Sequence, residues 1–303
     1  MLENNQKLPN KLFVAAFFIV LCVLILSLTE LDDKVWYFFH DMTISQEVEE
    51  RSIWLPEYHA NLVGLPIPGI DKNASGMTFN RDTNTLWVIV NSPTYLVELD
   101  LAFNLLRRID MKNFKDTEAI TYIGNDEYLL TDERDQSITL AKIDTQTTAL
   151  DKNNLEKIVL NFHGYSNKGL EGIAVDYLTN TIYAVRERDP MVLMKITGFI
   201  ENNNRIQIEK YDQINIDGLY MDDLSGLHFD VNSGHLLFLS DESKLLAEID
   251  LEGKKISYMD LEKGFNNLKQ SIPQAEGVVL DDEGHLYIVS EPNLLYRYEK
   301  KGE

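Results

Sequence analysis

The sequence predicts an all-β fold, a five-bladed β-propeller with a six-bladed one as the alternative, placed behind an N-terminal transmembrane helix. Two observations indicate the propeller. A unit of two β-rich runs joined by a turn occurs five times in the 303 residues, and consecutive copies lie 43, 53, 54 and 51 residues apart. That spacing is typical of blades made of four short strands. A third observation, an uncharged apolar run near the N-terminus, predicts the helix.

The apolar run spans residues 12–28, at the short end of what a membrane-spanning helix needs. Lys7 and Lys11 precede it and acidic residues follow it, so we expect residues 1–11 to be a cytoplasmic tail. A cleaved signal peptide is the rival interpretation, but the run is long for one and no A-x-A site follows. We therefore expect a single-pass signal-anchor in a bacterial inner membrane, with the C-terminal domain in the periplasm.

Residues 29–57 contain no copy of the repeat, and we expect them to connect the anchor to a propeller domain of residues 58–303. The aromatic run 35–40 suits either a membrane interface or packing on the domain, and the sequence leaves both open. The only cysteine, Cys22, lies inside the apolar run, so the exported part makes no disulfide.

The third copy, residues 169–197, shows the repeat most clearly. A first run, residues 173–175, leads through a turn to a second run, residues 182–185, and a third run follows at 191–196. Their strand propensity and turn residues favour a meander of antiparallel strands. A small residue occupies the same place in every copy: Gly76, Ala119, Gly172, Gly226 and Gly277.

The last copy is too short to complete its blade. Only one run, residues 294–298, follows its hairpin before the chain ends. Residues 58–63 come just before the first copy, and we expect them to supply the missing outer strand. Such closure leaves no open edge between the first and last blades.

Acidic residues occupy the same two places in several copies, before the first strand and after the second. Because the two strands are antiparallel, these places lie at one end of a blade, so that Glu118 is a neighbour of Glu133. If the blades close into a ring, seven glutamates surround one mouth of the central channel. They are Glu118, Glu133, Glu171, Glu187, Glu242, Glu276 and Glu291. Carboxylates so close together require water or a cation between them.

The three other positions are neutral: Ser75 and Asn91 in the first copy, and Ser225, which stands opposite Glu242 in the fourth. For any single glutamate, a salt bridge or a solvated surface position is the alternative interpretation. The arginines available for such bridges are Arg134, Arg186 and Arg188.

The ordered motifs of the five copies carry a family resemblance. They are residues 75–80 (SGMTFN), 116–122 (DTEAITY), 170–174 (LEGIA), 224–227 (LSGL) and 274–278 (QAEGV). With these motifs the chain resembles the bacterial SdiA-regulated (YjiK-like) family, which is distantly similar to NHL-repeat propellers. The resemblance covers residues 58–298 and implies a five-bladed propeller behind an N-terminal anchor, binding calcium. Ala119 departs from the glycine of the other copies.

Calcium suits the predicted ring of glutamates, because it takes 6–8 oxygen ligands from carboxylates, carbonyls and water. We expect Glu118, Glu133, Glu171 and Glu187 to be the first ligands, then Glu276 and Glu291, and Glu242 last. No linear EF-hand loop is present in the sequence. A formal net charge of −21 argues against binding nucleic acid or an anionic lipid surface.

Two functions from different classes remain. The first is a non-enzymatic calcium-binding propeller that presents its channel mouth to a small molecule or an envelope protein. The second is a calcium-dependent hydrolase of the lactonase or phosphoesterase type, which would need a general base at the mouth. No catalytic residue and no organic cofactor site can be assigned. The histidines His163, His228, His235 and His285 fall at scattered phases of the repeat. Binding is therefore the favoured function.

Overall fold

The computed structural model describes residues 12–21, 37, 42–160, 169–201 and 205–301. They belong to two compact units, Met1–Ile44 and Ser45–Glu303. In the first unit, residues 12–21 are helical. No helix within the described residues has the length and apolar character needed to cross a membrane. The rest of the expected anchor, residues 22–28, lies outside the described part, so anchoring stays a prediction.

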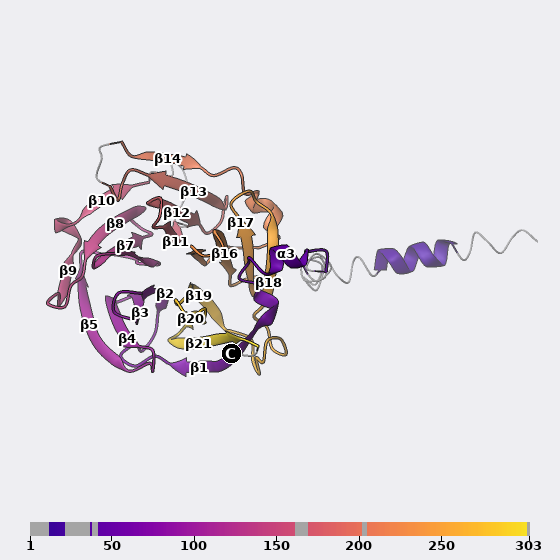
Figure 1. Ribbon diagram of the computed structural model, residues 1–303, viewed down its shortest axis with the longest axis horizontal. Helices are drawn as coiled ribbons and strands as arrows, with labels where there is room; N and C mark the ends of the chain where they lie inside the picture. The colour runs from indigo at the N-terminus through magenta and orange to yellow at the C-terminus, as the bar shows by residue number, and fades with distance from the viewer. Residues whose placement is uncertain (1–11, 22–36, 38–41, 161–168, 202–204, 302–303) are drawn as a thin grey trace, which may run out of the picture. The chain divides into compact units, whose positions relative to one another are not determined.

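The described part of the second unit forms five mostly antiparallel sheets arranged as the blades of a propeller (Figure 1). The first blade contains β2 (Ala74–Asn80), β3 (Thr85–Asn91), β4 (Thr94–Asp100) and β5 (Leu105–Lys112). The second contains β6 (Ile120–Gly124), β7 (Glu127–Asp132), β8 (Ser137–Lys142) and β10 (Glu156–Val159). The third contains β11 (Leu170–Asp176), β12 (Thr181–Arg186), β13 (Val192–Thr197) and β14 (Gln207–Lys210).

The fourth blade contains β15 (Gly226–Asp230), β16 (His235–Ser240), β17 (Leu245–Asp250) and β18 (Lys255–Asp260). The fifth contains β19 (Gln274–Leu280), β20 (Leu286–Glu291), β21 (Leu294–Lys300) and β1 (Tyr58–Pro66). The short helices are α3 (Gln46–Glu49), η1 (Leu55–Glu57), η2 (Lys152–Asn154) and η3 (Ile216–Leu219). Five predicted hairpins therefore begin five blades, and the six-bladed alternative is wrong.

Closure of the ring occurs as the sequence predicts. Strand β1 pairs antiparallel with β21, from Tyr58 opposite Lys300 to Pro66 opposite Leu294. The outer strand of the last blade thus comes from the beginning of the propeller sequence. This strand is three residues longer than the expected run 58–63, because pairing continues through Pro66 after a register shift.

The glycine of the repeat permits the inner strands to approach one another closely. A Cβ atom on Gly277 would lie 2.8 Å from the backbone nitrogen of Met77 and 3.0 Å from the Cα of Gly76. A Cβ on Gly76 would lie 2.6 Å from the carbonyl oxygen of Glu118. These contacts are closer than a side chain tolerates, so the small residue in each copy follows from the packing of first strands around the axis.

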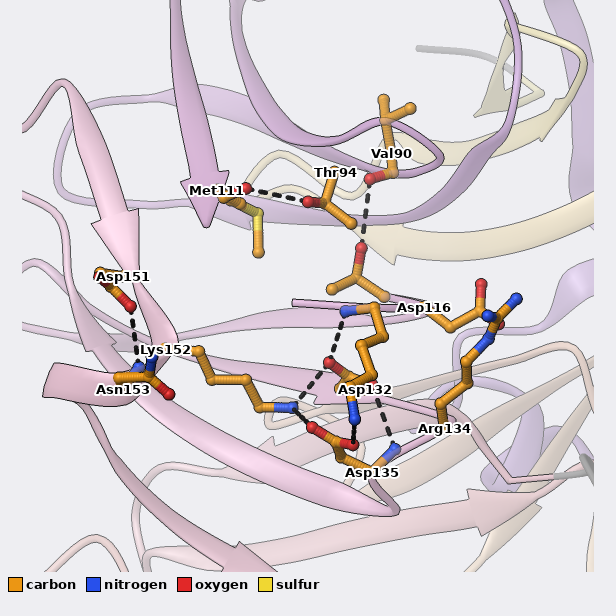
Figure 2. Close-up of polar contacts among 12 residues, drawn as sticks. Val90, Thr94, Met111, Asp116, Asp132, Arg134, Asp135, Asp151, Lys152 and Asn153 are labelled. Carbon is orange, nitrogen blue, oxygen red and sulfur yellow. Dashed lines mark hydrogen bonds and ion pairs between the residues drawn. The ribbon is translucent and has the colours of Figure 1, made fainter. Parts of the chain in front are cut away.

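Between β8 and β10 the chain leaves the second blade and adds a strand to the first, an excursion that comprises β9 and η2. Strand β9 (Ala149–Asp151) pairs in parallel with β5, and η2 follows it. Lys152 in η2 is 1% exposed, and its Nζ lies 2.6 Å from Asp132 and 3.0 Å from Asp135 (Figure 2). Burying an ammonium group is costly unless carboxylates pair with it. This buried ion pair therefore fixes the excursion against the end of β7.

The segment before β1 is part of the propeller core. Ile53 and Leu55 are buried in a cluster with residues of the fourth and fifth blades. The buried carboxylate of Glu248 on β17 accepts hydrogen bonds from the backbone nitrogens of Ile53 at 2.8 Å and Trp54 at 3.0 Å. Ser257 on β18 accepts another from the backbone nitrogen of Leu55. The compact unit accordingly begins before the first strand, at Ser45.

Candidate metal centre

A polar cavity of about 320 Å³ opens at the end of the propeller where the first strands begin. Eight carboxylates line it together with the single guanidinium of Arg188. The acidic lining residues are Glu118, Glu171, Glu187, Asp223, Asp241, Glu242, Glu276 and Glu291. Six of the seven glutamates singled out in the sequence are among them. We call this cavity with the adjacent Asp116 and Glu133 the acidic mouth.

Backbone pairing explains why acids distant in sequence meet here. The amide of Glu133 donates to the carbonyl of Asp116 at 2.7 Å, and the amide of Glu187 donates to the carbonyl of Gly169 at 3.3 Å. Each bond joins the residue after the second strand to a residue just before the first. The hairpin therefore brings both acidic positions of a copy to the same end of its blade.

The carboxylates of Asp116, Glu118 and Glu133 form the tightest group. One oxygen from each lies within 4.8 Å of the others. Asn91 donates a hydrogen bond to Glu118 Oε1 at 3.3 Å, and the amide of Gly169 donates to Glu133 Oε1 at 2.9 Å. These bonds orient two of the three side chains and leave other carboxylate oxygens of the group available to a ligand.

The carboxyl groups near the first strands have strongly altered acidity. Burial, followed by the charge of Asp116, raises the pKa of Glu118 to about 7. Burial and then the charge of Glu118 raise the pKa of Glu171 well above its usual value. Burial likewise raises the pKa of Glu276, although Gln274 opposes this by donating a hydrogen bond. Charged carboxylates are therefore costly in this cavity without a cation.

Glu171 is the lining residue whose carboxylate most clearly lacks a hydrogen-bond donor or a cation among the described residues. Its side chain faces the cavity, and within the described residues its carboxylate has no hydrogen-bond or ion-pair partner. Glu118, Glu276, Glu133 and Glu187 all raise its pKa through their charges. A carboxylate placed among carboxylates with no donor matches the donor set of a hard cation such as calcium.

Arg188 pairs with two carboxylates of the acidic mouth. Arg188 Nε lies 2.6 Å from Glu187 Oε1, and its Nη1 lies 2.6 Å from Glu242 Oε1. It thereby connects the third blade to the fourth. Of the other arginines proposed from the sequence, Arg134 pairs with Asp116 at 2.8 Å, and Arg186 is buried with 1% exposure.

Three acids of the acidic mouth were not assigned from the sequence: Asp116, Asp223 and Asp241. Asp223 accepts hydrogen bonds from Ser240 and from the amide of Glu242. Asp241 pairs with Lys244 at 2.5 Å and accepts from the amide of Ala275. The sequence pattern could have identified two of them, because Asp116 and Asp223 each lie two residues before the acidic or serine position that opens their copy.

The described histidines His228, His235 and His285 are not among the residues that line the acidic mouth. His235 contacts Glu248, and His285 contacts Asp281. His228 lies at the other end of the channel, beside a cavity of about 60 Å³, and burial lowers its pKa to about 4. At that end the guanidinium of Arg81 stacks 3.6 Å from the ring centroid of Tyr177. His163 lies outside the described residues.

The chain is similar to several solved structures of other proteins. A luciferin-regenerating enzyme aligns with a TM-score of 0.51 at 11% identity, over 80% of this chain and 96% of that one. A calcium-binding regucalcin from Agrobacterium tumefaciens aligns with a TM-score of 0.48 at 14% identity, over 78% and 93%. A chain of a nidogen/laminin complex aligns with a TM-score of 0.48 at 16% identity, over 77% and 85%. At these identities, likeness concerns the fold alone.

Fold and site together define a class, the five-bladed β-propeller closed by an N-terminal strand, with a carboxylate-lined mouth at one end of its axis. A family model described as SdiA-regulated matches residues 50–299. The chain belongs to the SdiA-regulated family, as the repeat motifs predict.

Proposed function

We propose that this protein is a calcium-binding propeller of the bacterial cell envelope. The observation that carries the proposal is the unpartnered carboxylate of Glu171 in a cavity where acidic groups greatly outnumber basic ones. Glu118 and Glu133, with Asp116, offer oxygens within 4.8 Å of one another. Glu187, Glu242, Glu276 and Glu291 surround this group as further or outer ligands.

Calcium fits these residues better than a softer metal would. The available donors are carboxylate and amide oxygens, and no cysteine or histidine is among the residues lining the cavity. Hard cations take such oxygens, and calcium accepts a larger and less regular set than magnesium does. When bound, the ion would supply positive charge that offsets the repulsion among the inner glutamates.

The proposed role of the acidic mouth is to present the bound ion to a small molecule or an envelope protein. The cavity is open and polar, which suits recognition of oxygen-rich ligands that complete the coordination of the ion. The net charge of −21 disfavours nucleic acid. The proposal keeps the N-terminal anchor of residues 12–28, with the propeller in the periplasm, on the basis of the apolar run and its basic flank.

A calcium-dependent hydrolase is the second candidate, and one observation favours it. The pKa of Glu118, about 7, is the value that a general base needs near neutral pH. Against it, no histidine faces the acidic mouth within the described residues. A screen of lactones and phosphoesters, with and without chelator, separates the two candidates. Turnover that chelator and Glu171→Gln both abolish would establish the hydrolase.

Calorimetric titration of the full chain with calcium tests the proposal. We expect saturable binding that Glu118→Gln and Glu171→Gln weaken, because each removes a negative charge beside the ion. Glu156→Gln on the exposed strand β10 is the matched control and should bind as the unmodified chain does. Titration that gives only heat of dilution would contradict the proposal.

A further inference from the structure

Two arginines occupy the same place in neighbouring copies of the repeat but point in different directions. Arg134 follows Glu133 in the second blade, and Arg188 follows Glu187 in the third. The side chain of Arg134 is 66% exposed and lies at the surface beside Asp116 (Figure 2). The side chain of Arg188 is 28% exposed and lines the cavity of the acidic mouth. Only Arg188 therefore places a cation among the lining residues.

The contacts of Arg188 are those of a bound cation between two ligands. Its Nε lies 2.6 Å from Glu187 Oε1 and its Nη1 lies 2.6 Å from Glu242 Oε1, two side chains from different blades. Among the described contacts, this guanidinium is the only group that contacts both of those carboxylates. A guanidinium is charged at every physiological pH, so it neutralises them permanently.

Two other carboxylates of the cavity, those of Glu118 and Glu171, lack such a cationic neighbour in the described contacts. Glu171 has no hydrogen-bond or ion-pair partner within the described residues, and Glu118 accepts hydrogen bonds from neutral groups, the amide of Asn91 and the hydroxyl of Ser75. Within the cavity, the carboxylates of Glu187 and Glu242 are thus paired with a cation and those of Glu118 and Glu171 are not, while Arg134 pairs with the adjacent Asp116 from the surface. A cation from solution is attracted to Glu118 and Glu171 and is repelled from Glu187 and Glu242 by the charge of Arg188.

We infer that Arg188 is a built-in counter-ion that limits the acidic mouth to one divalent cation, held on the side of Asp116, Glu118, Glu133 and Glu171. This inference rests on the proposed function, since it presumes that calcium binds there at all. Replacing Arg188 by a neutral side chain leaves Glu187 and Glu242 without a cation and opens a second position between them. Arg188 therefore determines how many calcium ions the acidic mouth binds.

Calorimetry of the full chain with calcium alone tests the inference. We expect one equivalent for the unmodified chain and about two for Arg188→Gln, the second binding more weakly. The double variant Arg188→Gln with Glu242→Gln removes one carboxylate of the new position and should return to one equivalent. Arg108→Gln, which removes an exposed arginine paired with Asp110 on β5, is the control and should also bind one.

The outcomes distinguish the inference from the proposed function. An unmodified chain that binds no calcium overturns both. A chain that binds one equivalent before and after Arg188→Gln, with affinities within about threefold, overturns the inference alone. Circular dichroism establishes that each variant is folded, and Arg188→Met replaces Arg188→Gln where the glutamine variant fails to fold. Two equivalents in the unmodified chain would also overturn the inference.

Discussion

Glu118 and Glu133, fifteen residues apart in sequence, bring carboxylate oxygens within 4.8 Å of one another. The backbone bond from the Glu133 amide to the Asp116 carbonyl sets this approach. The same hairpin geometry in other blades collects the remaining glutamates. The proposal of a calcium site follows from this geometric concentration of charge.

The charge of Glu171 among neighbouring carboxylates should make the protein less stable when calcium is absent. Glu171→Gln keeps the shape of the side chain and removes its charge, so it should relieve repulsion from Glu118 and Glu276. We expect a higher melting temperature in chelator and a calcium affinity lower by about tenfold or more, which is about 1.4 kcal/mol. Thermal melts with and without calcium measure both effects. A variant that melts lower in chelator would contradict this expectation.

Glu118 should make stability depend on pH in the absence of calcium. Its folded-state pKa of about 7 lies above the ordinary value of 4.5, so the folded chain holds this proton more tightly than the unfolded chain does. The resulting stabilisation is complete below about pH 4.5 and is lost as the pH rises to about 7. Its size is about 3 kcal/mol for this group.

Urea denaturation in chelator at pH 5, 6, 7 and 8 measures this dependence. Glu118→Gln should flatten the profile between pH 5 and 7, because its amide does not titrate. Calcium should raise stability more at pH 8 than at pH 5, since protons compete with the ion for the same oxygens. Identical profiles for the variant and the unmodified chain would exclude Glu118 as the titrating group.

Glu248 should be required for a stable propeller. Glu248→Ala removes the acceptor of the Ile53 and Trp54 amides and leaves both without a side-chain acceptor. We expect a loss of roughly 2–4 kcal/mol in the free energy of unfolding, measured in urea. Glu252→Ala in the exposed turn after β17 is the control. Equal stability of the two variants would contradict the role of Glu248.

Lys152 should stabilise the excursion that carries β9. Lys152→Met removes the ammonium group and leaves the buried carboxylate of Asp132 without its charged partner. Breaking a buried ion pair in this way typically costs about 3–5 kcal/mol. Lys157→Met on the exposed strand β10 provides a comparison with the same change of side chain. Urea melts that differ by less than about 1 kcal/mol would argue against the pair as a stabilising contact.

Much of this architecture follows from the repeat. The copies predict the hairpins, the hairpins place the glutamates at one end, and the short last copy predicts closure by β1. These inferences succeed because each depends on local pairing and on alternation within a few residues.

Other features depend on contacts that the sequence does not reveal. Glu248 meets Ile53 across 195 residues, and neither residue belongs to the repeated motif. The inward direction of Arg188 depends on the space between two blades, since Arg134 in the equivalent place points outward. The parallel addition of β9 to β5 likewise arises from an irregular excursion without a repeat signal.

A crystal structure of the calcium-soaked protein, with anomalous diffraction data, tests the calcium site most directly. We expect an anomalous peak inside the acidic mouth, about 2.3–2.6 Å from carboxylate oxygens of Glu118 and Glu171. A cavity without a peak, or peaks only at the other end of the channel, such as at residues 281–284, would contradict the calcium site.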